Sequence, residues 1–250
     1  MAEFDRPSVA TAQGSTAVVD QGLRSYMLRV YNYMGIGLVV TGLVAWFTYT
    51  QSFVEQNGRI VGVTPLGAAL YNSPLQWVIM LAPLAFVLVL SFGVQKLSVP
   101  VTQILFWAFA AVMGLSLSSI FAVYTGGSIA QVFFISAATF GAMSLYGYTT
   151  KRDLTQIGSF LMMGLIGIII ASLVNLFVGS TALQFAISVI GVIVFTGLTA
   201  WDTQRIKEVY FESDPGDVMT KKALMGALSL YLDFINLFVM LLQLVGQRRE

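Results

Sequence analysis

The sequence contains no cysteine and no histidine, and charged residues make up only 10% of its 250 residues. The first two absences exclude disulfides, thiolate nucleophiles, histidine general bases and the metal, haem and cluster sites that these residues build. A soluble domain carries about 25% charged residues, so this chain lacks the charge to cover a globular surface. Its net charge of +1 offers no basic field, and we predict no nucleic-acid partner. With 57% hydrophobic residues, the chain is predicted to have the lipid bilayer as its partner.

Charged residues are also missing from two long stretches, between Lys96 and Lys151 and between Asp153 and Asp202. A membrane-spanning helix needs about 20 apolar residues, so each stretch is long enough for two crossings and a turn. Glycine-rich breaks at 126–128 and 179–181 divide them. The apolar runs predict an all-α integral membrane fold with seven transmembrane helices. Their predicted bounds are Val30–Thr50, Leu75–Val94, Val101–Tyr124, Ala130–Tyr148, Gly158–Val178, Leu183–Trp201 and Ala223–Gly246.

The flanking segments predict how the chain is oriented. Residues 1–29 are polar and lack the pattern of a signal peptide, so we expect a cytoplasmic, partly disordered tail before a transmembrane domain at 30–246. Residues 247–250 form a short C-terminal tail. Cytoplasmic loops carry an excess of Lys and Arg, which predicts a cytoplasmic N-terminus. Seven spans then place Arg248 and Arg249 outside, so either this tail is translocated or the last segment does not fully cross. The predicted cytoplasmic cations are Arg24, Arg29, Lys96, Lys151, Arg152, Arg205, Lys207, Lys221 and Lys222.

Two acids remain within the apolar runs. Asp233 is flanked by several apolar turns on both sides, and an acid near the centre of a membrane helix costs roughly 2.5–3.5 kcal/mol. Asp202 closes the sixth run, five residues before Lys207, which corresponds to about 8 Å along a helix. Asp233 lies eleven residues after Lys222, about 16 Å along the seventh helix. The chain reverses between them, so both acids lie in the cytoplasmic half, where a close pair is possible.

Two carboxylates in a medium of low dielectric cannot both ionise cheaply, so a pair would share a proton and respond to pH. When ionised, Asp202 and Asp233 are candidate ligands for a hard cation such as Ca²⁺. Ser229 and Asn236 lie on the same helix face as Asp233 and offer supporting oxygens. The alternative is structural: Asp233 is neutral, or bonds to Lys96 or to Tyr or Ser side chains of other helices.

Residues 199–206 (TAWDTQRI) and 227–238 (ALSLYLDFINLF) resemble the closing signature of the Bax inhibitor family, the transmembrane Bax inhibitor motif proteins. Residues 141–154 (GAMSLYGYTTKRDL) look like the bacterial branch, and the resemblance extends over 22–248. It implies seven helices with the last surrounded by the other six, in a bacterial inner membrane. It also implies a pH-sensitive Ca²⁺ leak controlled by an aspartate pair, which by motif match is Asp202 and Asp233.

The resemblance also implies an ion pair and a partner. In some family members a basic residue at the cytoplasmic end of the second helix pairs with the acid of the sixth and acts as a latch. This chain has Lys96 near that place, and lysine lacks the bidentate fork of arginine. Bacterial relatives have also been linked to modulation of a membrane-bound protease, which is an interaction role.

Three functions are therefore in competition. The first is a pH-sensitive Ca²⁺ leak channel or transporter, with Ca²⁺ as the transported ion and no cofactor. The second is a regulatory protein that binds other membrane proteins, such as a protease. The third, an intramembrane aspartyl protease, requires a Tyr-Asp pair and a Gly-x-Gly-Asp motif, whereas here the acids follow Ala200-Trp201 and Tyr231-Leu232. We predict that the protein is not an enzyme.

Overall fold

The computed structural model describes residues 8–56 and 59–249, with side chains from residue 21 onward. Among them, seven helices are long and apolar enough to cross a membrane, as the sequence predicts. The spans are formed by α1 (Ser8–Ser52), α3 (Leu75–Gly93), α4 (Val99–Leu117) continued by α5 (Ser119–Val123), α6 (Gly126–Thr149), α7 (Thr155–Val178), α8 (Thr181–Glu208) and α9 (Gly216–Val245).

Several helices extend beyond their apolar runs. The first begins at Ser8, well before the predicted start at Val30, while residues 1–7 lie outside the described residues. No proline interrupts the chain between these points, and polar residues of ordinary helix propensity continue a helix outside the hydrocarbon region. For the same reason α8 continues seven residues past Trp201 to Glu208. The partial disorder expected for the tail stays a prediction.

The segment between the first two spans contains a short hairpin and a short helix. The strands β1 (Phe53–Gln56) and β2 (Arg59–Val63) pair antiparallel, and β-branched and aromatic residues suit these strands. The short helix α2 (Pro65–Tyr71) follows. Thr64 caps it by accepting a hydrogen bond from the backbone N–H of Gly67 at 3.1 Å, with Pro65 at the favourable first position.

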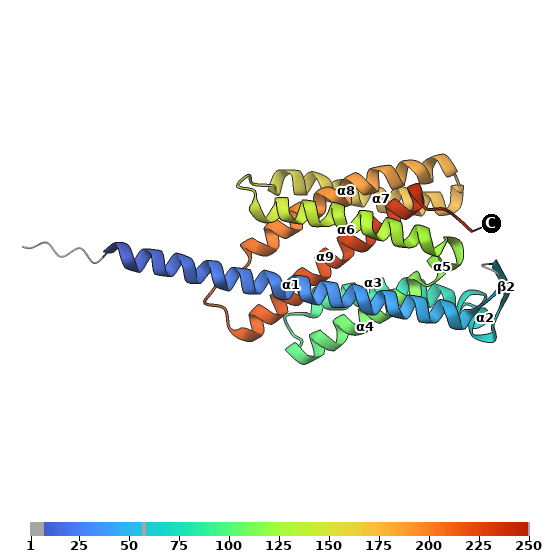
Figure 1. Ribbon diagram of the computed structural model, residues 1–250, viewed down its shortest axis with the longest axis horizontal. Helices are drawn as coiled ribbons and strands as arrows, with labels where there is room; N and C mark the ends of the chain where they lie inside the picture. Colours follow the sequence, from blue (N-terminus) through green and yellow to red (C-terminus); the bar gives the residue numbers. More distant parts are fainter. Residues whose placement is uncertain (1–7, 57–58, 250) are drawn as a thin grey trace, which may run out of the picture.

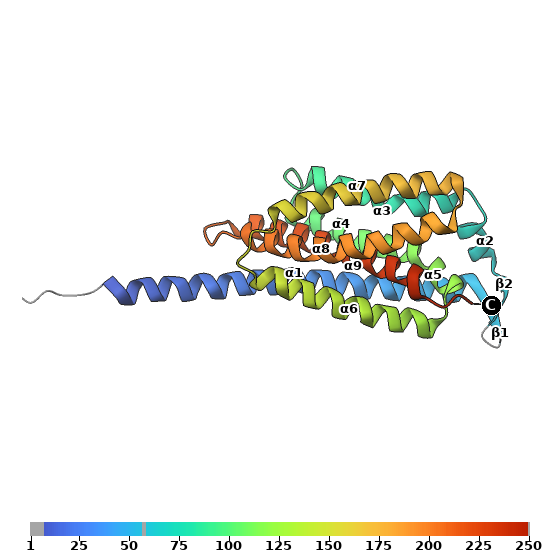
Figure 2. The ribbon, with the colours of Figure 1, turned by 90° about the horizontal axis from the view of Figure 1, so that it is seen from above.

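The long helices form a bundle with α9 at its centre (Figures 1 and 2). Its principal neighbours are α1, α4, α6 and α8, while α3 packs mainly on α4, and α7 mainly on α8. More of α9 is buried than of any other span, 56% of its most apolar window against 11% for α3 and α7. The last helix is therefore central, with four helices against it and two outside these.

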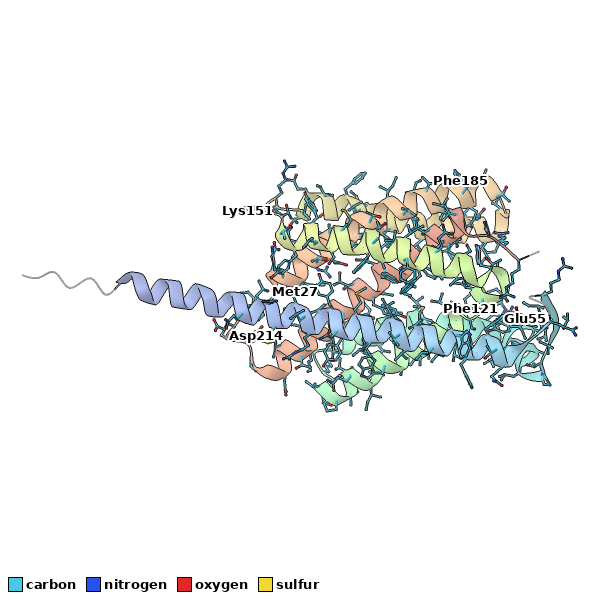
Figure 3. The ribbon with its side chains drawn as sticks, in the orientation of Figure 1. Met27, Glu55, Phe121, Lys151, Phe185 and Asp214 are labelled. Atoms are coloured by element: carbon cyan, nitrogen blue, oxygen red, sulfur yellow. The ribbon has the colours of Figure 1, made fainter. Side chains whose placement is uncertain are left out.

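The bundle has two ends (Figure 1), and most of the described Lys and Arg residues lie toward one of them. We call one the basic end, where residues 94–98, 150–154 and 209–215 connect the helices. The other is the hairpin end, which carries β1, β2, α2 and the last described residues. In Figure 3, Lys151 and Asp214 mark the basic end, and Glu55 marks the hairpin end.

A buried hydroxyl contact fixes the central helix. Tyr231 on α9 is fully buried, and its hydroxyl donates to Thr41 Oγ1 on α1 at 2.6 Å. The Thr41 hydroxyl in turn donates to the carbonyl of Ala110 on α4 at 2.8 Å. Buried polar groups need such partners, so this chain of bonds ties three helices together at a defined rotation of α9.

Candidate functional site

The structure brings together the two acids that the sequence singles out. Asp202 on α8 and Asp233 on α9 are 8% and 5% exposed, and their carboxyl groups hydrogen-bond to each other. A carboxylate only accepts hydrogen bonds, so two carboxyl groups can join in this way when one of them carries a proton. The pair is a buried contact between α8 and α9.

The pair is short of donors. Asp202 Oδ1 and Asp233 Oδ2 are buried, and no hydrogen-bond donor among the described residues reaches either. Arg205 Nη2 lies 3.3 Å from Asp202 Oδ1, an ion pair whose direction does not make a hydrogen bond. A buried oxygen without a donor costs free energy, so the two acids lack part of the compensation that buried carboxyl groups need.

Close packing holds α8 in place beside the pair. Gly147 on α6 lies against the backbone carbonyl of Ala200, where a Cβ atom would collide with it. The Thr203 hydroxyl donates to the carbonyl of Thr199 at 2.7 Å and accepts from Ser144 Oγ on α6 at 3.0 Å. The position of Asp202 is thus set by contacts on either side of it along α8.

Gln204 anchors the connection that leads from α6 to α7. Its side-chain amide donates to the carbonyl of Arg152 at 2.8 Å, and its side-chain oxygen accepts from the N–H of Leu154 at 2.8 Å. Gln204 is buried and both of its polar atoms are satisfied. The sequence analysis did not single out this residue, because its partners are backbone groups about fifty positions away.

The three predicted supporting residues are not bonded to the pair. Ser229 lines a pocket at the basic end, and Asn236 donates to the carbonyl of Leu232 on its own helix at 2.8 Å. Lys96 is exposed and takes part in none of the ion pairs formed by the described residues. The latch suggested for Lys96 is therefore not formed in this structure.

Arg205, and not Lys96, is the cation that is paired with Asp202 in this structure. It lies one turn after Asp202 on α8, and its guanidinium lies 5.0 Å from the centre of the Trp201 ring. Its side chain is 50% exposed, so the cation stands between the buried pair and the solvent. The i, i+3 spacing from Asp202 was the sequence signal that could have identified it.

The acids present do not form a conventional metal centre. Within residues 8–56 and 59–249, no group of three or more Asp, Glu, His or Cys side chains could hold a metal ion. Ca²⁺ takes six to eight oxygen ligands, of which two carboxyl groups supply only a part. The assignment of Asp202 and Asp233 as Ca²⁺ ligands stays a prediction.

A second acidic site lies at the hairpin end. Glu55 accepts a hydrogen bond from the Tyr49 hydroxyl at 2.8 Å, and its carboxylate forms an ion pair with the Arg249 guanidinium at 3.2 Å. These two partners, the tyrosine first, hold the pKa of Glu55 below its ordinary value.

Arg249 also donates from its backbone N–H to the carbonyl of Val123 at 2.9 Å, so the residues after α9 are bound at the hairpin end. The last helix therefore runs the full length of the bundle, which favours a full crossing.

Comparison with known proteins places the chain in a family. Residues 23–250 match the family model described as inhibitor of apoptosis-promoting Bax1. The chain is 49% identical to the inner membrane protein YbhL of Escherichia coli K12 over 230 residues, covering 91% of this chain and 94% of that one. It is 46% identical to an uncharacterized protein of Rickettsia prowazekii over 250 residues, the full length of both. A Caulobacter vibrioides protein is 47% identical over 240 residues, 93% and 92% of the two chains. The chain thus belongs to the Bax inhibitor family of membrane proteins.

Proposed function

We propose that the protein is a pH-sensitive leak pathway for cations, with Ca²⁺ as the transported ion, controlled by Asp202 and Asp233. The observation that carries this proposal is the hydrogen bond between two buried carboxyl groups on neighbouring helices, each with an oxygen that lacks a donor. Intramembrane acids commonly mark ion and proton pathways. The family resemblance implies the same activity for this pair.

The control arises from the charge of the pair. Two unit charges 4 Å apart repel by about 4 kcal/mol at an effective dielectric constant of about 20. With one proton shared, the carboxyl groups attract each other and hold α8 and α9 together. Without it, the two negative charges either separate the helices or attract a cation, and the populations of the two states shift with pH.

Few other charges act on this equilibrium. Among the described residues, the charged groups that act on Asp233 are Asp202 and Arg205, both on α8. Tyr31 on α1 and Ser144 on α6 are uncharged; their hydroxyls bond to each other at 2.5 Å, and Ser144 also bonds to Thr203 on α8. Since the chain has no histidine, the aspartate pair is the proposed sensor.

We further propose that the protein lies in a bacterial inner membrane with its N-terminus and basic end in the cytoplasm. The relative YbhL is named an inner membrane protein. Of the described Lys and Arg residues, Arg59, Arg248 and Arg249 lie toward the hairpin end, and the other nine lie toward the basic end. This asymmetry agrees with the excess of cations in cytoplasmic loops.

The experiment is Ca²⁺ flux into vesicles that contain the purified protein and a trapped fluorescent indicator, measured over a series of pH values. We expect flux that depends on pH in the wild type and loses that dependence in Asp233→Asn. The matched control is Asp153→Asn, an exposed acid in the connection at the basic end. There the Thr155 hydroxyl and backbone N–H hold the pKa of Asp153 below its ordinary value, so it stays ionised and its loss should leave the pH profile unchanged.

Two results would count against the proposal. Equal Ca²⁺ flux in empty and protein-containing vesicles at every pH would exclude the leak pathway and leave a regulatory role toward another membrane protein, such as a protease. An unchanged pH profile in Asp233→Asn would show that the acid pair is not the sensor.

A further inference from the structure

The basic end contains a pocket of about 610 Å³ that is lined by neither acid of the pair. It lies between the residues just after α3, the last turns of α8 and the first turns of α9. Its volume is within the range of about 300–1,000 Å³ that is typical of small-molecule sites. The pocket therefore has the size of a ligand site and lies where helices leave the membrane.

The charge of the pocket favours an anion. Arg205, Lys221 and Lys222 all line it, and none of the residues that line it is acidic. Lys222 is neutralised by Asp214 at 2.6 Å, and Arg205 is paired with Asp202. Lys221 is half-buried and, within the part of the chain that the structure describes, has no acidic partner. An anion in this pocket would supply the missing partner.

The remaining walls of the pocket are apolar. Val94 after α3, Val218 and Met225 on α9, and Val209 after α8 line it beside the cations. A free inorganic anion gains nothing from apolar walls, whereas a lipid uses both surfaces. Its phosphate pairs with basic side chains, and its acyl chain covers the apolar ones. The outer helix α3 packs mainly on α4, and the residues just after its end form one wall of the pocket.

We infer that this pocket binds the phosphate group of an anionic phospholipid, with Lys221 and Arg205 as its ligands. The inference does not depend on the proposed function. The consequence of lipid binding for regulation does rest on the proposed function, because Arg205 also pairs with Asp202 at 3.3 Å. A phosphate that draws the guanidinium away removes the cation that acts on the acid pair, and so links the lipid to the control of the leak.

The test measures lipid retention without any ion flux. The protein is placed in nanodiscs of equal parts phosphatidylglycerol and phosphatidylethanolamine, released into mild detergent, and its bound lipids are counted by native mass spectrometry. We expect phosphatidylglycerol to be enriched in the wild type. In Lys221→Gln and in Arg205→Gln the enrichment should fall about fivefold, which corresponds to about 1 kcal/mol for one basic side chain beside an anionic membrane.

The matched control is Lys151→Gln, which removes the same charge from an exposed position at the same end, outside the pocket. Its enrichment should equal that of the wild type, and an equal loss in this variant would overturn the site in favour of a general surface charge effect. Retention of both lipids in equal amounts by the wild type would also overturn it. Release of phosphatidylglycerol by millimolar inorganic phosphate would identify a site for free anions instead. Because the readout is bound lipid, a failure here is distinct from a failure of the Ca²⁺ flux experiment.

Discussion

The acid pair inside the bundle and the acidic site at the hairpin end contain the same functional group in opposite surroundings. Glu55 at the hairpin end has a side chain that is 39% exposed, a tyrosine donor and an arginine partner. Asp233 is 5% exposed, and its only hydrogen-bond partner among the described residues is another carboxyl group. A carboxylate with full compensation stays ionised, whereas an acid that must share a proton changes its charge with its surroundings. The contrast teaches that burial without hydrogen-bond donors, and not acidity alone, makes the charge of an acid sensitive to its surroundings.

The helices that surround the two sites differ as well. The Glu55 site depends on the residues after α9, where the backbone N–H groups of Thr125 and Arg249 donate to the carbonyls of Gln247 and Val123. The Asp202–Asp233 pair depends on close approach between α6, α8 and α9. Loss of packing should therefore harm the aspartate pair most, whereas loss of charge pairing should matter at the Glu55 site. Three substitutions separate these contributions.

The largest effect is expected from filling the contact between α6 and α8. In Gly147→Ala the new Cβ would collide with the backbone carbonyl of Ala200, which cannot move aside as a side chain would. Overpacking of this kind costs about 1–3 kcal/mol of unfolding free energy. Thermal unfolding in detergent should show a clear loss of stability. The control is Gly141→Ala on the same helix, where nothing lies within 4 Å of the new atom. Equal stability of both variants would show that this contact does not restrain α8.

An intermediate effect is expected from removing the cation beside the pair. In Arg205→Gln the ion pair with Asp202 is lost, so the acid pair loses the cation that stands beside it. Because Arg205 is half-exposed, the midpoint of Ca²⁺ flux against pH should shift by no more than about one pH unit. Lys207→Gln, two residues further along α8, is the control, since Lys207 donates to the carbonyl of Tyr148. A midpoint that moves equally in both variants would argue against a specific pair.

The smallest effect is expected at the hairpin end. The pKa of Glu55 is lowered from 4.5, so its contribution to stability is present at neutral pH and lost as the pH falls through the lowered pKa. Exposed ion pairs contribute at most about 1 kcal/mol, so Glu55→Gln should lower the unfolding free energy by that amount or less. Unfolding measured at neutral and at acidic pH should show the difference only at neutral pH. Glu212→Gln, an exposed acid in the connection between α8 and α9, should show none. A larger loss of unfolding free energy at acidic pH than at neutral pH would contradict the expected direction of this pH dependence.

Much of the fold could be predicted because the membrane imposes a simple rule on the sequence. Apolar runs of sufficient length identify the seven spans, and the sequence places Asp202 and Asp233 in the same half of the bundle. The start of the first helix was harder, since Ser8 lies in polar sequence where the hydrocarbon boundary no longer limits the helix. The hairpin at 53–63 was missed, because two short strands carry little periodic signal.

The site was predictable in its acids and not in their partners. Lys96 was expected beside Asp202 from its position after the second span, but its side chain is exposed while Arg205 is paired with the acid. The choice between them depends on side-chain direction and helix rotation, which are set by contacts such as those of Tyr231 with Thr41 and Gly147 with Ala200. Such contacts join residues far apart in the chain, so no local pattern reports them.

The sequence alone determined that this protein spans a membrane seven times and that two aspartates remain where charge is costly, because hydropathy depends on residue type and order. Only the tertiary structure decided that the two acids hydrogen-bond to each other, that an arginine of the same helix is their cation, and that a basic pocket lies beside them. The physical reason is that these properties depend on how α8 and α9 are rotated and packed within the bundle. Long-range packing sets that arrangement, and the spacing of residues along one helix does not.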